Sequence, residues 1–181
     1  MKRLVASIAL LLIITSYLLS CEKDDLCADG TPTTPGLVIN FYKKNSSDVA
    51  NTIQKLYFHE VGSEKRDSII NSAQLILPLR SDAEIVKFAL ENVTTPTGST
   101  TPTISTAIFE IKYTHMQTYI SRACGYKSTF ILTPGTLELP NPGVTSDVPD
   151  TDPWFLQSDI NVITSNIEIQ DEKKPHINIY F

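Results

Sequence analysis

Residues 107–114 have the sequence AIFEIKYT, which carries the clearest structural signal in the chain. Apolar and polar side chains alternate along it, with Phe109, Ile111 and Tyr113 in one set and Glu110, Lys112 and Thr114 in the other. Successive side chains of an extended strand point to opposite faces, so a period of two is typical of a strand with one face in the core. This segment therefore predicts a half-buried β-strand.

The same alternation extends in both directions from this strand. It recurs in the segments 37–41, 55–59, 75–79, 118–123, 127–132, 160–163, 167–169 and 177–181. Residues 85–90 fit either a short strand or the start of a helix with a capping box at Ser81, and their strand-like neighbours favour the strand. About eight or nine short strands without a helix predict an all-β fold, an antiparallel β-sandwich that is immunoglobulin-like or similar, over residues 36–181.

Individual residues add detail to the expected sandwich. In the last strand, Ile177, Ile179 and Phe181 are expected to point inward, and His176, Asn178 and Tyr180 outward. Pro78 interrupts an apolar run and predicts an edge strand or a strand end. Residues 93–106 and 139–153 are rich in Pro, Thr, Ser and Gly, and we expect them to form mobile loops. No internal repeat is evident.

The first twenty residues have the composition of an export signal. Two basic residues precede an almost unbroken apolar run from Leu4 to Leu19. This run of about 16 residues is short for a membrane-spanning helix, which needs about 20. It ends in Leu18-Leu19-Ser20-Cys21, which resembles the lipobox cut by the lipoprotein signal peptidase. The resemblance implies a cleaved signal peptide at residues 1–20 and lipid on Cys21, and the alternative is an uncleaved signal-anchor helix.

The residues after Cys21 form a charged and then extended tether. Glu22-Lys23-Asp24-Asp25 resembles the surface-export signal of Bacteroidota lipoproteins, although a merely soluble, charged tether has the same composition. Residues 31–36, TPTTPG, are typical of a stiff extended spacer. Residues 21–35 are therefore expected to link the outer membrane to the folded domain, which faces either the cell surface or the periplasm.

The chain has three cysteines, an odd number for an oxidising compartment. Once Cys21 carries lipid, Cys27 and Cys124 form one candidate disulfide. Closing a loop of about 100 residues would stabilise the fold by about 4.7 kcal/mol in the chain-entropy account. The alternative is two free thiols, because the sequence alone does not bring the two Cβ atoms together.

Composition and motifs argue against several functions. Acidic residues outnumber basic ones by 20 to 15, and the net charge of −5 disfavours binding to nucleic acid. The chain lacks a CxxC pair, a GxSxG elbow and the glycine-rich motifs of nucleotide sites. Its three histidines, His59, His115 and His176, lie on separate predicted strands without metal-ligand spacing, and we expect them to be half-exposed. We therefore expect no metal, no cofactor and no catalytic residue.

Two further features are candidate sites. Trp154 and Phe155 form either an aromatic platform that faces a ligand, because rings stack on sugars and anchor partners, or a lid on the core. Asp67-Ser68-Ile69 resembles the O-glycosylation acceptor of Bacteroidota exported proteins, with Ser68 as the acceptor. The same three residues are also typical of the start of a strand.

A set of short segments spread over the chain carries a further likeness. The set is Cys21-Glu22-Lys23-Asp24-Asp25, Thr33-Thr34-Pro35 before Leu37-Val38-Ile39, Leu77-Pro78-Leu79, Ser121-Arg122-Ala123-Cys124-Gly125 and His176-Ile177-Asn178-Ile179-Tyr180-Phe181. Together these segments resemble a family of uncharacterised Bacteroidota lipoproteins defined by a domain of unknown function. The resemblance implies a β-rich lipoprotein at the cell surface or facing the periplasm, and it implies no activity.

These observations lead to one main hypothesis and two alternatives. We expect a non-catalytic lipoprotein, held on the membrane by its N-terminal lipid, whose sandwich binds an envelope protein or a glycan. The alternatives are a hydrolase of surface polymers and a structural subunit of an outer-membrane assembly. A cleft that holds two convergent acids or a Ser-His pair would favour the hydrolase.

Overall fold

The computed structural model describes residues 26–138, 153–163, 165 and 167–181. These residues form two compact units. The larger unit takes the described residues within 33–118 and 127–181, and the smaller unit takes residues 26–32 and 119–126. The larger unit holds the hydrophobic core, and the smaller unit holds a disulfide bond.

Eleven β-strands and the short 3-10 turn η2 occur in the described residues, which contain no α-helix. They are β1 (Leu37–Lys43), β2 (Ser46–Ala50), β3 (Ile53–Glu60), β4 (Asp67–Ser72), β5 (Gln74–Leu77), β6 (Ile85–Thr94), β7 (Thr103–Ser121), β8 (Gly125–Glu138), η2 (Gln157–Asp159), β9 (Ile160–Val162), β10 (Glu168–Ile169) and β11 (Ile177–Tyr180). The all-β prediction is confirmed, with more strands than the expected eight or nine.

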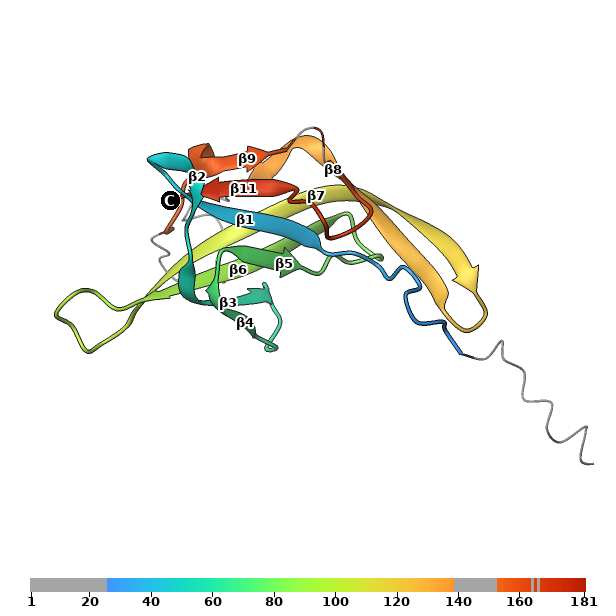
Figure 1. The fold of residues 1–181 in the computed structure, drawn as a ribbon, viewed down its shortest axis with the longest axis horizontal. Coiled ribbons are helices and arrows are strands. Elements are labelled where there is room, and N and C mark those ends of the chain that lie inside the picture. The colour runs from blue at the N-terminus through green and yellow to red at the C-terminus, as the bar shows by residue number, and fades with distance from the viewer. Residues whose placement is uncertain (1–25, 139–152, 164, 166) are drawn as a thin grey trace, which may run out of the picture. The chain divides into compact units, whose positions relative to one another are not determined.

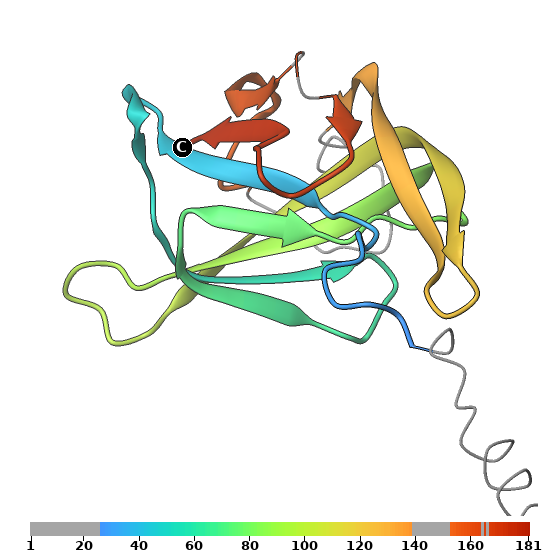
Figure 2. The same cartoon turned by 45° about the vertical axis from the view of Figure 1, so that its right-hand side comes forward.

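The strands form two sheets that pack together as a sandwich (Figures 1 and 2). The smaller sheet has the order β2-β1-β11-β9, with β5 also paired to β1, and the larger sheet has the order β10-β8-β7-β6-β3-β4. The antiparallel sandwich is confirmed, and within it β1 and β11 form a parallel pair, with Ile39 opposite Ile177. A parallel pair needs a long crossover, and here the chain between β1 and β11 builds the whole larger sheet.

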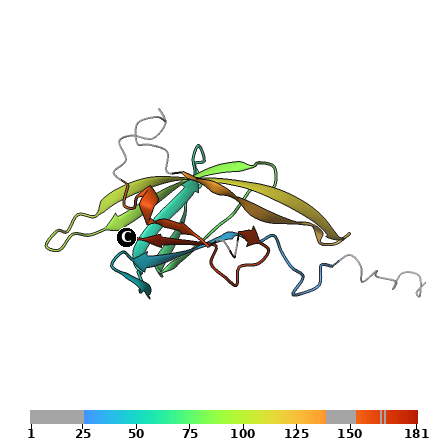
Figure 3. The ribbon, with the colours of Figure 1, turned by 90° about the horizontal axis from the view of Figure 1, so that it is seen from above.

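The core lies between the facing sides of the two sheets, which Figure 3 views from above. Phe109, Ile111 and Tyr113 of β7 are buried there, which confirms the alternation predicted for residues 107–114. From the smaller sheet, Phe41 and Ile179 reach the same cluster. At the opposite parity Val38 is buried, whereas Asn40 and Tyr42 of β1 and Asn178 and Tyr180 of β11 are half-buried and form an outer face.

Some parts of the chain fold differently from the expectation. The sequence pattern does not predict β2, which is mostly polar, and it indicates only the start of β4, an edge strand with largely exposed side chains. The loop expected over residues 93–106 is wrong at both ends, since Thr94 at the end of β6 pairs with Thr103 at the start of β7, which leaves residues 95–102 between the strands. Threonine and β-branched residues suit paired strands, which explains the longer hairpin. Residues 139–152 of the other expected loop lie outside the described residues.

The chain reaches β1 through Gly36, which lies against the neighbouring strand β5. A Cβ atom at this position would lie 2.5 Å from Cγ2 of Ile76 and 3.0 Å from the carbonyl oxygen of Leu77. The amide of Gly36 donates a hydrogen bond of 2.7 Å to Oε1 of Glu172. Only glycine allows this close approach. A larger residue at position 36 would push the start of β1 away from β5.

Candidate functional site

The outer face of β1 and β11 carries a matched set of polar and aromatic side chains. In both strands the apolar residues of one parity are buried in the core. These are Ile39, Phe41, Ile177 and Ile179. The parallel register then places Asn40 opposite Asn178 and Tyr42 opposite Tyr180 on the outer face.

Four carboxamide side chains form a row across this face, from β5 through β1 and β11 to β9. Gln74 pairs with Asn40, Asn40 with Asn178, and Asn178 with Asn161. Figure 1 shows these four strands side by side. Nε2 of Gln74 donates a 3.0 Å hydrogen bond to Oδ1 of Asn40, and Oδ1 of Asn178 is a buried atom without a hydrogen-bond partner among the described residues. We call these four residues the amide row.

Two tyrosines stack beside the amide row. The ring centroids of Tyr42 and Tyr180 lie 5.6 Å apart, with 27° between the ring planes. Nδ2 of the Asn40 side chain donates a long hydrogen bond of 3.5 Å to the hydroxyl of Tyr42. This contact connects the tyrosine pair to the amide row. The amide row and this tyrosine pair together form what we call the amide–tyrosine face.

A hollow of about 250 Å³ opens at one side of the amide–tyrosine face, where β2 ends and β5 begins along β1. Its lining consists of Asn40, Phe41, Tyr42, Ala50, Ser72, Ala73 and Gln74. None of these lining side chains is charged. The hollow is smaller than the ~300–1,000 Å³ of sites for drug-sized ligands, so it suits a single small ring of a neutral ligand.

His176 lies beside Val38 of β1, and its burial corrects the expectation of an outward, half-exposed ring. It is only 2% exposed. Its Nδ1 accepts a 3.0 Å hydrogen bond from the amide of Val38, and its own amide donates to the carbonyl of Val38 at 2.9 Å. Burial lowers the pKa of His176, while the charges of Asp171 and Glu172 act in the opposite direction. The imidazole is therefore held neutral as part of the backbone hydrogen bonding.

The low pKa of His176 predicts that stability falls in acid. An unfolded histidine has a pKa of about 6.5, so below this pH the unfolded chain binds more protons than the folded chain. The stability that neutral His176 supplies is complete above about pH 6.5 and is lost as the pH falls. Urea unfolding measures the free energy of unfolding at about pH 7.5 and at about pH 5. The difference between these two values should be smaller for His176→Asn than for the wild type.

His59 supplies the comparison for this experiment. Burial lowers the pKa of His59 as well, with a further contribution from the charge of Arg66. His59→Asn should therefore remove a separate part of the acid sensitivity, and the double variant should remove both. An unchanged pH dependence in His176→Asn would show that its ring does not titrate with unfolding.

The outer side of β3 and β6 carries a separate group of ionisable side chains. Nδ1 of His59 lies 3.9 Å from Oε1 of Glu91, and Glu91 forms an ion pair with Arg66. The guanidinium of Arg66 also lies 4.8 Å from the ring centroid of Tyr57. Because Arg66 neutralises the carboxylate, this group is an ion-pair network.

A Ser-His pair, which would favour the hydrolase, does not occur in the described part of the chain. There no serine hydroxyl is hydrogen-bonded to a histidine ring.

Trp154 and Phe155 do not form the ligand-facing platform that the sequence allowed. Phe155 is 2% exposed. The ring centroid of Trp154 lies 5.9 Å from that of Phe41 and 4.7 Å from that of Phe181. Its indole nitrogen donates a 3.0 Å hydrogen bond to the carbonyl of Leu90. The platform interpretation is corrected, because both rings are used to close the core.

Ser68 is exposed on β4, opposite Tyr57 of β3. The alternative interpretation of this segment is confirmed, since Asp67 is the first residue of β4. The hydroxyl of Ser68 is accessible, and its O-glycosylation stays a prediction.

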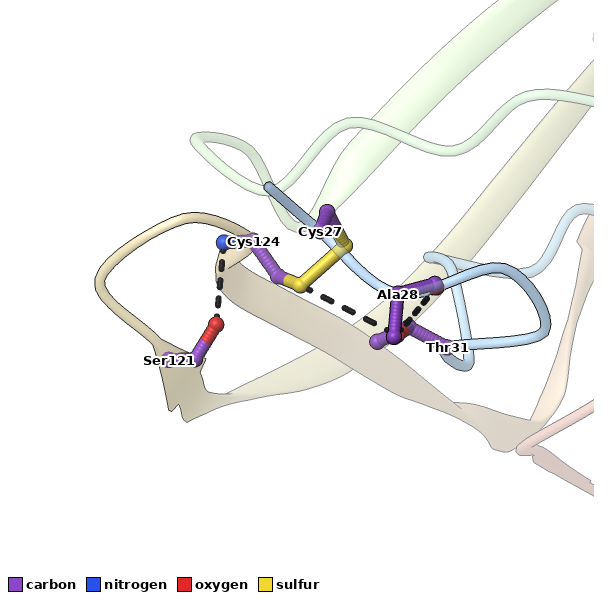
Figure 4. The surroundings of a disulfide bond; sticks show 5 residues. All are labelled: Cys27, Ala28, Thr31, Ser121 and Cys124. Atoms are coloured by element: carbon purple, nitrogen blue, oxygen red, sulfur yellow. Dashed lines mark hydrogen bonds between the residues drawn. A yellow bond between two sulfur atoms is a disulfide. The ribbon is translucent and has the colours of Figure 1, made fainter. Parts of the chain in front are cut away.

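The smaller unit contains the expected disulfide between Cys27 and Cys124 (Figure 4). The two Cα atoms are 4.9 Å apart. Around it, the amide of Cys124 donates to the hydroxyl of Ser121, and the hydroxyl of Thr31 donates to the carbonyl of Ala28. Cys21, the expected lipidation site, lies outside the described residues.

Other kinds of site are absent from the described residues. The described residues contain no group of three His, Cys, Asp or Glu side chains that could hold a metal ion. In the same part of the chain, no helix has the length and apolar character to cross a membrane. Comparison of the chain with protein families, curated proteins and solved structures finds no match.

The amide–tyrosine face was missed by the sequence analysis, although the sequence contains a signal for it. Residues 39–42 read INFY and residues 177–180 read INIY. The two segments agree at three of four positions. Each copy places an asparagine and a tyrosine at one parity and two apolar residues at the other. The pattern predicts the composition of each strand's outer face, but it does not predict that the two copies lie side by side.

Proposed function

We propose that this protein is a non-catalytic, lipid-anchored lipoprotein of the outer membrane whose sandwich binds a neutral glycan through the amide–tyrosine face. The observation that carries the proposal is the amide row in register beside the stacked pair Tyr42 and Tyr180. The lipid anchor is inferred from the lipobox-like segment that ends at Cys21.

The chemistry of the face matches the chemistry of a sugar. A carboxamide offers two donors and an acceptor, so it can bind two neighbouring hydroxyl groups of one ring. An aromatic ring gives the apolar side of a sugar a surface on which to pack. The hollow beside Tyr42 offers space for one such ring, and the amides of Asn40 and Gln74 line its wall.

The face is better suited to binding than to cleavage. Hydrolysis of a glycosidic bond commonly requires two carboxylates on opposite sides of that bond. The residues that line the hollow supply amides, a hydroxyl and a phenol. Uncharged lining also favours a neutral glycan over an anionic one, because it offers no cation to pair with an anionic group.

The proposal is tested by screening the unlipidated mature chain against a glycan array and titrating the best-binding glycan by calorimetry. Tyr42→Ala should weaken binding by at least about tenfold, equivalent to about 1.4 kcal/mol, because it removes the ring beside the hollow. Tyr42→Phe should retain most of the affinity, since it keeps the ring and loses only the hydroxyl.

Tyr57 provides a matched control, because it is also a half-buried tyrosine on the outer side of a strand, in the larger sheet. Tyr57→Ala should leave glycan binding unchanged. Absence of binding to any neutral glycan, or equal affinities for the wild type and Tyr42→Ala, would contradict the proposal.

A further inference from the structure

Two exposed tyrosines lie at the turn between β7 and β8, in the smaller unit. Tyr119 is 57% exposed and Tyr126 is 66% exposed, and their ring centroids are 5.4 Å apart in an edge-to-face arrangement. Arg122 is the one charged residue within 119–126 and is exposed. This turn therefore presents two amphipathic rings and a single cation, in a chain whose net charge is −5.

The disulfide ties this turn to the segment that follows the expected anchor. Cys124 lies in the turn and is bonded to Cys27 (Figure 4). The segment after Cys27 is itself held by Thr31, whose amide and hydroxyl both donate to the carbonyl of Ala28, at 3.1 Å and 2.7 Å. Sγ of Cys124 lies 3.9 Å from the hydroxyl of Thr31. The turn and the residues near the anchor thus form one cross-linked unit.

Chain length limits how far this unit can be from the membrane. Cys27 follows Cys21 by six residues, which span at most about 22 Å when fully extended. Tyr126 follows Cys124 by two residues, or at most about 7 Å. The layer of lipid headgroups is itself about 5–8 Å deep. A lipid on Cys21 would therefore hold the backbone of Tyr126 within about 35 Å of the lipid, and Tyr119 with it because the two ring centroids are 5.4 Å apart, so both rings can reach the headgroups.

We propose that Tyr119 and Tyr126 dock in the headgroup layer of the membrane that holds the lipid on Cys21. Tyrosine is enriched at membrane interfaces, because its ring is apolar and its hydroxyl is polar. Arg122 can pair with lipid phosphates beside the rings. The tether raises the effective concentration of the bilayer around the turn, so even weak contacts are populated. This inference rests on the lipid anchor of the proposed function and is independent of glycan binding.

The test places tryptophan at the turn of the full-length, lipidated protein in phosphatidylethanolamine–phosphatidylglycerol vesicles that contain brominated lipid. Emission from Tyr119→Trp and from Tyr126→Trp should be quenched at least about twofold more than emission from Ile70→Trp. Ile70 is a matched control because it is 63% exposed on β4 of the larger unit. The wild type gives the background emission of Trp154, which is partly buried and packed against the core.

Mass spectrometry of the same sample separates the two ways in which the test can fail. If Cys21 carries lipid and the turn variants are quenched no more than Ile70→Trp, docking of the turn is overturned and the anchor stands. If Cys21 carries no lipid, the anchor and the docking fail together. Adding Cys27→Ala and Cys124→Ala to Tyr119→Trp should lower its quenching, and unchanged quenching would overturn the part assigned to the disulfide.

Discussion

Replacing Cys27 and Cys124 with alanine is expected to lower the free energy of unfolding by up to about 4.7 kcal/mol. The bond closes a loop between residues 97 positions apart, and such a loop restricts the unfolded chain far more than the folded one. This loss is a large fraction of the ~5–15 kcal/mol that stabilises a typical domain. Urea unfolding of the unlipidated mature chain at neutral pH measures it as a lower midpoint.

The fold itself should survive the loss of the bond. The core cluster belongs to the larger unit, and neither cysteine is part of it. The double variant should therefore retain the far-ultraviolet spectrum of a β protein while it unfolds at a lower urea concentration. The wild type with a reducing agent should behave as the double variant does, which controls for effects of the alanines. Equal midpoints with and without the bond would show that it does not restrict the unfolded chain.

The sequence predicts most strands because the core imposes a period of two on them. In β3, Leu56 and Phe58 are buried, and the residues between and beside them are more exposed. In β6, Val86, Phe88 and Leu90 share one parity and are buried, and the small Ala89 between the last two is buried as well. This regularity arises because one face of each strand meets the opposite sheet, and it is visible in any segment that is buried on one side only.

Pairing between distant strands is not visible in this pattern. β2 and β4 pair through their backbones and bury little apolar surface, so their sequences carry no period. The parallel alignment of β1 with β11 joins residues 138 positions apart, as for Ile39 and Ile177. The amide row depends on this alignment, since it takes one residue from each of four strands. Its members can be recognised in the sequence only after the sheet order is known.

Residue type also fails to separate a binding residue from a structural one. Trp154 and Phe155 have the composition of a ligand platform, yet the neighbours of both rings make them a lid on the core. His176 has the parity of an exposed residue, yet a backbone amide of β1 holds its ring in place. In both cases tertiary contacts decide burial, and these contacts come from segments far apart in the sequence.

A Cys21→Ala precursor is expected to incorporate no radiolabelled palmitate and to keep its N-terminus at Met1. In lipoproteins with a lipobox, the cysteine thiol receives the diacylglyceryl group and cleavage before the cysteine follows that transfer, and the proposed anchor requires the same of Cys21. Each buried methylene of an acyl chain contributes about 0.8 kcal/mol, so two or three chains hold a protein firmly whereas their loss releases it. The expected change is therefore nearly complete loss of labelling.

The variant with Cys27→Ala and Cys124→Ala is the matched control, since those two sulfurs are bonded to each other and should not affect labelling. Continued labelling of Cys21→Ala, or an intact Met1 in the wild type, would remove the basis for the anchor and for docking of the turn. Binding of a glycan to the amide–tyrosine face would be unaffected by either result, because that face lies entirely within the larger unit.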